Sequence, residues 1–327
     1  MLACGEASLC LVACRQHAAL HNPTEETRLL TSADIKGVIA AIVTPFDSNG
    51  QINPGAIETI VEYLVSNGVH GIMTTGGTGE FPMLLREERK YVTQLVVEQV
   101  NGRVPVIAGT ASCSTQETLL LMEDAAEAGA GAAIVVAPYY FRLPEDTLYR
   151  YYMELADRGA LPVVLYNNPL YTGNNLSATT MAKLATHERI IGVKQSNTNM
   201  GELVELVRLA GDRMAVTTGI DSQFYPALCI GATGVFSTAA SVIPSQMVQV
   251  YSLFQKGQRD DALALHMKLQ SLNRFLEYDP GYVAPAKEAL AIMGYPAGPV
   301  RQPQPDLTPN EREGLRQALL ELGLINC

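Results

Sequence analysis

Eight short apolar runs alternate with amphipathic stretches from Ile35 onward, and this alternation limits the folds open to the chain. The runs are short and rich in β-branched residues, as buried strands are. Parallel strands need a helical crossover between them, so strand–helix units in series predict a parallel sheet. The predicted strands cover residues 38–43, 70–75, 104–108, 132–137, 161–165, 190–193, 214–217 and 234–236.

Eight such units match an α/β fold of the closed (β/α)8 TIM-barrel type in number and length. The competing fold is a doubly wound open sheet, but no Gly-rich dinucleotide-binding pattern follows the first predicted strand. We therefore predict a barrel over residues 34–256. Three further helical patterns, at 260–275, 285–293 and 309–322, predict a C-terminal helical appendage over 257–327 that packs on the barrel.

Residues 1–33 are expected to be a leader that is disordered or misassigned. Its short apolar run follows Glu6, without a preceding Lys or Arg, so the positive segment of a secretory signal is missing. No apolar run approaches the roughly 20 residues that a membrane-spanning helix requires. The predicted location is the cytoplasm.

The net charge of the chain excludes some classes of binding partner. The chain of 327 residues carries a formal net charge of −10. This acidic balance argues against a nucleic-acid partner and against binding to an anionic membrane surface. The six cysteines show no zinc-type spacing with each other or with histidine, and we predict no metal site.

One lysine stands in an unusual place for a charged residue. Lys194 ends the apolar run that begins at Ile190, so its amine is expected to be partly desolvated. Desolvation disfavours the ammonium form, and a neutral amine can attack a ketone to form a Schiff base. The alternative is a lysine that extends from a strand end into solvent.

Polar residues follow the other predicted strands, at the end of a barrel where catalytic groups are placed. Taken singly, each has a structural alternative such as a tight turn, packing or a helix cap. Together they form a polar inventory: Thr44, Gly76 to Glu80, Thr110, Pro138 to Tyr140, Tyr166 to Pro169, Gly219, Asp221, Ser237 and Thr238.

These residue types suit the chemistry of a 2-oxo acid. The imine formed on Lys194 is an electron sink. Backbone N–H groups at Gly77 and Thr78, with the Thr78 hydroxyl, can hold a substrate carboxylate. The phenol of Tyr166 can move a proton when a carbon–carbon bond forms or breaks.

In order and spacing, five segments resemble the dihydrodipicolinate synthase / N-acetylneuraminate lyase family of class I aldolases. The resemblance extends from Ile35 to about Leu324. The segments are Ala41 to Phe46, Gly76 to Glu80, Pro138 to Tyr140, Tyr166 to Pro169 with Thr172 and Gly173, and Gly192 to Lys194.

The resemblance implies roles for individual residues. Lys194 is the Schiff-base lysine, Tyr166 the acid/base phenol, and Thr78 with its neighbouring amides the binding site for the pyruvate carboxylate. Tyr140 matches the aromatic residue that family members insert into a neighbouring subunit's site, so a homo-oligomer, a dimer or a tetramer, is expected. No cofactor is implied. The catalytic candidates are Lys194, Tyr166 and Tyr140, and the substrate-binding candidates are Gly77, Thr78, Thr44, Tyr171, Ser196, Asp221 and Ser237.

Two positions depart from the synthases of this family. Gly77 stands where they carry a hydroxyl residue of a proton relay, and Tyr171 stands where they carry an Arg that binds the carboxylate of aspartate semialdehyde. A phenol does not replace a bidentate Arg–carboxylate contact. Ser196 and Asp221 look like the sialate lyases, yet Ser222 stands where those lyases place a Glu that binds sugar hydroxyls.

The segment from Gly76 to Phe81 is similar to sugar-acid dehydratases, which differ from this chain at Asn168 and Pro169. The favoured function is a Schiff-base lyase, an aldolase or a dehydratase, that acts on pyruvate or a 2-keto-3-deoxy sugar acid. One alternative is a 4-hydroxy-tetrahydrodipicolinate synthase that condenses pyruvate with aspartate semialdehyde. The other is a catalytically poor sensor that binds a 2-oxo acid.

Overall fold

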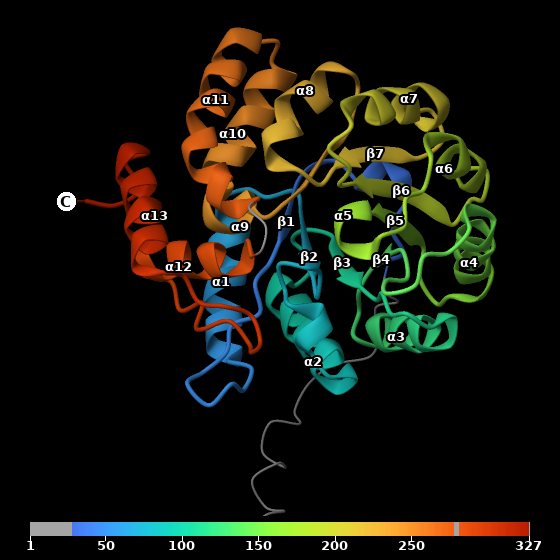
Figure 1. Ribbon diagram of the computed structural model, residues 1–327, viewed down its shortest axis with the longest axis horizontal. Coiled ribbons are helices and arrows are strands. Elements are labelled where there is room, and N and C mark those ends of the chain that lie inside the picture. The colour runs from blue at the N-terminus through green and yellow to red at the C-terminus, as the bar shows by residue number, and fades with distance from the viewer. Residues whose placement is uncertain (1–27, 278–280, 327) are drawn as a thin grey trace, which may run out of the picture.

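Eight parallel strands close into a barrel in the computed structural model, which describes residues 28–277 and 281–326. Each strand pairs with its sequence neighbour, and β1 pairs with β8 to close the ring (Figure 1). The predicted TIM barrel is confirmed. Its strands are β1 (Gly37–Ala41), β2 (Gly71–Thr74), β3 (Val106–Gly109), β4 (Ala132–Val136), β5 (Val163–Asn167), β6 (Ile190–Gln195), β7 (Ala215–Thr218) and β8 (Gly234–Ser237).

Helices surround the barrel, and several of them begin at a side chain that caps the helix. Asn53, for example, accepts a hydrogen bond from the backbone of Ala56 and is followed by Pro54 at the first helical position. The helices around the barrel are α1 (Pro54–Ser66), α2 (Arg86–Val100), α3 (Thr115–Glu127), α4 (Glu145–Arg158), α5 (Pro169–Thr172), α6 (Ala178–Leu184), α7 (Met200–Ala210), α8 (Phe224–Cys229), α9 (Ala239–Val242) and α10 (Pro244–Gln255).

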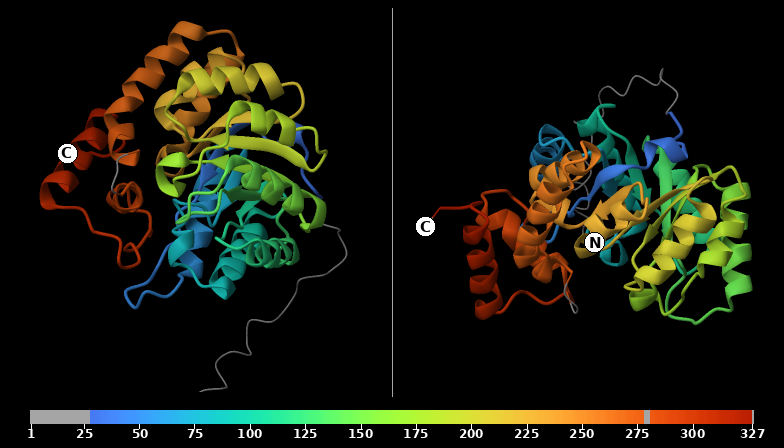
Figure 2. Two further views of the ribbon diagram at one scale, coloured as in Figure 1. Left: turned by 45° about the vertical axis from the view of Figure 1, so that its right-hand side comes forward. Right: turned by 90° about the horizontal axis from the view of Figure 1, so that it is seen from above.

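Three helices follow the barrel: α11 (Arg259–Leu276), α12 (Val283–Ile292) and α13 (Pro309–Glu321). They gather on one side of the cylinder, over α9 and α10 (Figures 1 and 2). Leu272, Leu290 and Leu319 are fully buried and belong to the same hydrophobic cluster as residues of β1, β2 and β8. A second cluster lies mainly along β3 to β7 and their helices, and it also includes Ile39, Met73 and Phe236 from the other three strands. The C-terminal helices therefore share the core of one half of the barrel.

A buried ion pair ties α12 to the loop after β2. Lys287 Nζ lies 2.5 Å from a carboxylate oxygen of Glu80, and both side chains are almost completely buried. Lys287 also donates to the carbonyl of Pro299, while the other Glu80 oxygen accepts from Gln304 and from the backbone of Arg301. Paired and hydrogen-bonded in this way, the charges fix the position of α12 against the barrel.

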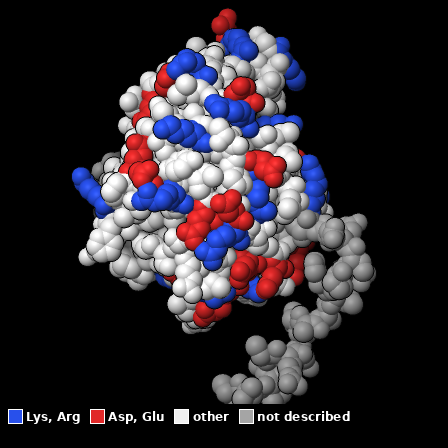
Figure 3. Space-filling model, turned by 90° about the vertical axis from the view of Figure 1, so that its right-hand side faces the viewer, with Lys and Arg blue, Asp and Glu red and all other residues white. Residues whose placement is uncertain are grey.

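The outer helical face that includes α4, α6 and α7 carries acidic and basic side chains side by side (Figure 3). Pairs such as Arg150 with Asp146 and Arg208 with Glu205 lie along single helices of this kind. Among the helices that the structure describes, none is long and apolar enough to cross a membrane. Most of the predicted leader, residues 1–27, lies outside the described residues.

Candidate active site

The side chain of Lys194 projects from β6 into the barrel. Every residue of β6 is buried, and Lys194 is 5% exposed. Gly219, just after β7, makes room for it, because a Cβ at that position would come closer than 3.0 Å to Lys194 Cε. A side chain at position 219 would therefore collide with the lysine stem and with the Ser196 hydroxyl.

Strand register places Tyr166 beside Lys194. The two residues are direct partners in the β5–β6 ladder, and Lys194 Nζ lies 4.4 Å from the centroid of the Tyr166 ring. The amide of Asn168 donates a hydrogen bond of 3.1 Å to the Tyr166 hydroxyl. The predicted nucleophile and the predicted acid/base phenol thus meet at one level of the barrel, and Asn168 orients the phenol.

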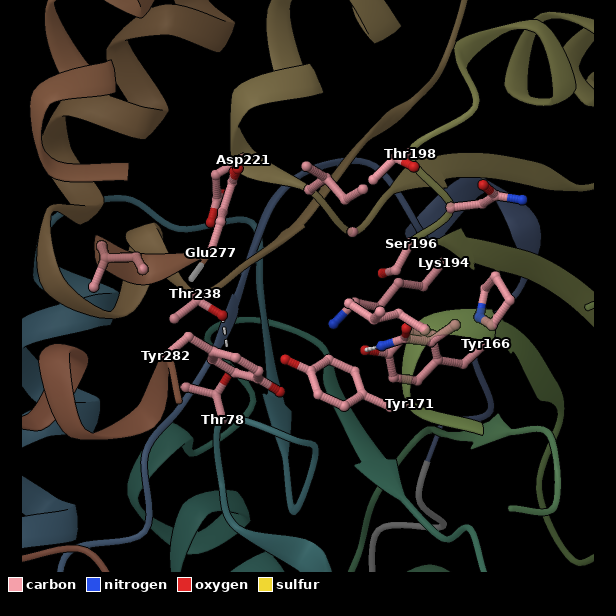
Figure 4. A pocket seen from close by; sticks show the side chains of 17 residues that line it. Thr78, Tyr166, Tyr171, Lys194, Ser196, Thr198, Asp221, Thr238, Glu277 and Tyr282 are labelled. Carbon is pink, nitrogen blue, oxygen red and sulfur yellow. Dashed lines mark hydrogen bonds between the residues drawn. The ribbon is translucent and has the colours of Figure 1, made fainter. Parts of the chain in front are cut away.

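These groups open into a pocket of about 370 Å³ at the carboxyl end of the strands. Figure 4 shows Lys194, Tyr166, Tyr171, Thr78 and Tyr282 converging on this space. The other lining residues are Asn168, Pro169, Leu170, Ser196, Asn197, Thr198, Gly219, Ile220, Asp221, Thr238, Leu276 and Glu277.

The loop after β2 brings Thr78 to the floor of the pocket. The Thr78 and Thr238 hydroxyls form a hydrogen bond of 2.9 Å (Figure 4). Thr44 donates its hydroxyl to the carbonyl of Gly79 at 2.7 Å and holds the same loop from below. Thr44 is buried and does not line the pocket. It supports the loop that carries Thr78.

Two carboxyl groups form one wall. Burial raises the pKa of Asp221, although hydrogen bonds from Ser237 and Ala239 and the nearby Lys194 charge oppose the shift. Burial, followed by the charge of Asp221, raises the pKa of Glu277 to about 7. Glu277 accepts a hydrogen bond from the backbone N–H of Ser222. Burial and the neighbouring Asp221 charge therefore favour the protonated form of Glu277 up to about neutral pH.

Within the described residues, Asp221 Oδ1 and Ser196 Oγ are buried without a hydrogen-bond partner. Both residues line the pocket. A buried polar atom without a partner is costly, so these two atoms are suited to bind a polar ligand.

Three other predicted site residues lie away from the pocket lining. Ser237 is buried behind Asp221, and its hydroxyl accepts from the backbone of Ala240. Gly77 is covered by Tyr282. Tyr140 is 86% exposed, has a positive φ of 82° and packs on the exposed ring of Phe141. Its insertion into a partner's site stays a prediction.

Sequence reasoning missed Glu277 and Tyr282. Both come from the C-terminal helices, at the end of α11 and just before α12, rather than from a strand end. The local sequence around them carries no catalytic pattern. The only signal was indirect, because a glycine at position 77 leaves a volume that some other side chain must fill.

A buried lysine amine beside a phenol, at the carboxyl end of a (β/α)8 barrel, defines a Schiff-base-forming lyase of the aldolase class. The comparisons with known proteins agree with this class. The profile of the Dihydrodipicolinate synthetase family matches residues 34–322. The chain is 39% identical over 292 residues to the 4-hydroxy-tetrahydrodipicolinate synthase of Thermodesulfovibrio yellowstonii, covering 89% of this chain and 99% of that one.

Solved structures give the same result. The dihydrodipicolinate synthase of Acinetobacter baumannii complexed with pyruvate has a TM-score of 0.86 and 34% identity, over 89% of this chain and 100% of that one. A prophage protein of the dihydrodipicolinic acid synthase family from E. coli K12, also in complex with pyruvate, has a TM-score of 0.85 and 29% identity, over 89% and 99%. The chain belongs to the dihydrodipicolinate synthetase family, whose enzymes are class I lyases that form a lysine Schiff base with pyruvate.

Within the described residues, no three His, Cys, Asp or Glu side chains gather as metal ligands.

Proposed function

We propose that this protein is a lyase that cleaves or dehydrates a hydroxylated 2-oxo acid of the 2-keto-3-deoxy sugar acid type. The observation that carries the proposal is the pair of carboxyl groups, Asp221 and Glu277, on the pocket wall near Lys194. Carboxyl groups bind sugar hydroxyls by accepting their protons in hydrogen bonds, and they repel a second substrate carboxylate.

The charge of the lining supports the same substrate class. Among the described residues around the pocket, Lys194 is the only basic one. Once Lys194 has bound pyruvate, the carboxylate of aspartate semialdehyde would therefore find no cation among these residues, and Tyr171 cannot make a bidentate contact with it. Ser196, Asn197 and Thr198 instead offer neutral hydrogen-bonding groups along the same wall.

Glu277, at the end of α11, supplies a carboxylate that the chain lacks at position 222, in the segment after β7. Ser222 stands at the position where the sialate lyases carry a glutamate, and the carboxylate of Glu277 lies against the Ser222 backbone. A carboxylate thus lies in this part of the pocket, although it comes from a different segment of the chain than in the sialate lyases. We therefore expect hydroxyl groups of the substrate to bind there.

The proposed chemistry balances without a cofactor. The neutral amine of Lys194 attacks the C2 carbonyl, and the Tyr166 phenol protonates the leaving hydroxide, which departs as water and leaves an iminium with a Tyr166 phenolate. In aldol cleavage, the phenolate takes the proton of the C4 hydroxyl. The C3–C4 bond then breaks and its electron pair moves toward the iminium, which releases an aldehyde and leaves an enamine. Protonation at C3 and hydrolysis release pyruvate.

A panel of 2-keto-3-deoxy acids tests the proposal. Pyruvate release, or loss of water with retention of the carbon chain, is expected for at least one member. The expected substrate should turn over with much higher kcat/KM than aspartate semialdehyde plus pyruvate. If none of the hydroxylated acids reacts while the condensation is efficient, the proposal is wrong.

The second candidate is the synthase reaction, because the relative from Thermodesulfovibrio yellowstonii carries that name at 39% identity. A coupled assay of aspartate semialdehyde consumption addresses it directly. The sensor alternative is separated by adding borohydride with pyruvate. A stable adduct on Lys194 without any turnover across the panel would favour a sensor.

A further inference from the structure

The hydroxyl group of Tyr282 lies directly against Gly77. A Cβ built on Gly77 would come closer than 3.0 Å to the Tyr282 hydroxyl oxygen, while its distance to Tyr282 Cζ would be 3.5 Å, an ordinary contact. The phenol oxygen alone therefore excludes a side chain at position 77. It occupies the place that such a side chain would take, next to Thr78 at the pocket floor.

The same loop that carries Gly77 also holds the helix that carries Tyr282. Glu80 donates its backbone N–H to the carbonyl of Gly77 at 3.0 Å, and its carboxylate binds Lys287 of α12. Lys287 follows Tyr282 by five residues, so the buried ion pair sets the distance between the phenol and the loop. Glu80 thus contacts both the loop that carries Gly77 and the helix that follows Tyr282, and it holds the two residues together.

The phenol of Tyr282 shares the pocket with two others. Burial raises its pKa well above the ordinary value, and the nearby Tyr166 and Tyr171 phenols add to the shift. The rings of Tyr171 and Tyr282 lie edge to face with centroids 6.1 Å apart. Figure 4 shows all three phenols directed into the cavity. Tyr282 therefore stays protonated and acts as a hydrogen-bond donor beside the acid/base residue.

We infer that Tyr282 is a positioning residue for proton transfer, whose hydroxyl replaces a loop side chain at position 77 and stabilises the Tyr166 phenolate. The inference rests on the proposed Schiff-base chemistry of Lys194 and Tyr166. When the Tyr166 phenol has given its proton to the leaving water, Tyr282 donates a hydrogen bond to the phenolate. The phenolate then takes a proton from C3 of the iminium, the C–H electron pair forms the enamine, and Tyr166 regains its proton.

Exchange of the methyl hydrogens of pyruvate for deuterium in D2O isolates this step. It requires the imine and the enamine but no second substrate, and NMR follows it directly. Tyr282→Phe keeps the ring and removes only the hydroxyl. We expect it to lower the exchange rate by about 10²-fold, the lower end of the effect of a lost acid/base group, while borohydride still traps pyruvate on Lys194.

Gly77→Ser supplies a second, independent variant. In the wild-type background its Cβ collides with the Tyr282 hydroxyl, so exchange is expected to fall. In the Tyr282→Phe background the collision is gone, and the serine hydroxyl occupies the vacated place. The double variant should recover to within about tenfold of the wild-type rate, a rescue that simple loss of packing would not produce.

Tyr295→Phe is the matched control, because that phenol stacks on Tyr63 of α1 and does not line the pocket. Its exchange rate should equal that of the wild type. Wild-type exchange in Tyr282→Phe, or a double variant no better than Tyr282→Phe, would overturn the role of Tyr282. If the wild-type protein neither exchanges pyruvate nor forms an adduct, the Schiff-base function fails instead, and the two failures are thereby distinguished.

Discussion

The two walls of the pocket differ in how they are built. One wall carries Lys194 and Tyr166 at the strand ends, where ladder hydrogen bonds fix each residue relative to its neighbours. The other wall includes Glu277 and Tyr282, which come from the ends of two helices outside the barrel. Strand register controls the first wall, and side-chain packing with one buried ion pair controls the second.

The two walls also differ in the kinds of side chain that they carry. The strand-end wall carries Lys194 and Tyr166, to which we assign the steps that form and break the imine, and its motifs are those in which the chain resembles its family. The helical wall carries acidic and phenolic groups that the sequence patterns did not mark. We infer that the barrel supplies the nucleophile and the acid/base residue. The C-terminal helices add Glu277, which acts on the substrate, and Tyr282, which supports the Tyr166 phenolate.

Replacing Lys194 by Ala is expected to have the largest effect. Turnover should fall to background and the reductively trapped pyruvate adduct should vanish from the mass spectrum, because no other amine reaches the pocket from the described lining. Circular dichroism and thermal unfolding should show a folded barrel. Substantial remaining turnover would mean that another group is the nucleophile, and the comparison between the walls would lose its basis.

Converting Tyr166 to Phe should lower kcat by roughly 10² to 10⁴, as expected for a lost acid/base group. The ring contact with Lys194 Nζ is kept, so trapping of a pyruvate adduct should persist at a lower rate. Steady-state and single-turnover kinetics measure the two quantities. An unchanged kcat would remove Tyr166 from the mechanism.

Replacing Lys287 by Met tests the anchor of the helical wall. The change leaves the Glu80 carboxylate buried without its ion-pair partner, which typically costs 3–5 kcal/mol, so we expect a loss of about that size in the free energy of unfolding. Arg150→Met is the matched control, because its pair with Asp146 is exposed and contributes only about 0–1 kcal/mol. Urea unfolding compares the two. Equal stabilities would show that the ion pair does not hold α12.

Glu277→Gln should act on the substrate and spare the pyruvate steps. Above about pH 7, where Glu277 is ionised, the amide keeps hydrogen-bonding capacity but removes the charge. We expect the KM for the hydroxylated acid to rise there by about tenfold, which corresponds to about 1.4 kcal/mol. Deuterium exchange into pyruvate should be unchanged. A large fall in exchange instead would place Glu277 among the groups that act on the imine.

The same variant should also change the pH dependence of stability, by a smaller amount. The pKa of Glu277 is raised from 4.5 to about 7 in the folded protein. Its contribution to the free energy of unfolding is therefore complete below about pH 4.5 and is lost as the pH rises through about 7. Urea unfolding across this range should show a shallower decline for Glu277→Gln than for the wild type. Parallel curves would contradict the raised pKa.

Much of the barrel could be predicted because its signals are local. The run that ends at Lys194 has the length and composition of a buried strand, and β6 covers the whole run and one residue more. The meeting of Tyr166 with Lys194 also follows, because both stand near the carboxyl ends of consecutive predicted strands. The three C-terminal helices were recognised from their periodicity in the same way.

The helical wall could not be predicted, because it depends on how α11 and α12 dock. Amphipathic periodicity shows which face of a helix is buried but not which barrel loop its end approaches. Nothing local to Tyr282 indicates that its hydroxyl reaches Gly77, and nothing local to Glu277 indicates contact with Ser222. Thr44 was placed among the substrate-binding candidates because it follows a strand, yet its hydroxyl bonds to Gly79 beneath the pocket floor.

Leu272, Leu290 and Leu319 share their apolar cluster with β1, β2 and β8, and this has a practical consequence for anyone who wishes to shorten or recombine the chain. Truncation after α10 would expose apolar surface on the strands and helices of the barrel. We expect the fragment to aggregate rather than to fold as a minimal enzyme. Chimeras with other barrels should therefore keep the C-terminal helices together with the β1, β2 and β8 region on which they pack.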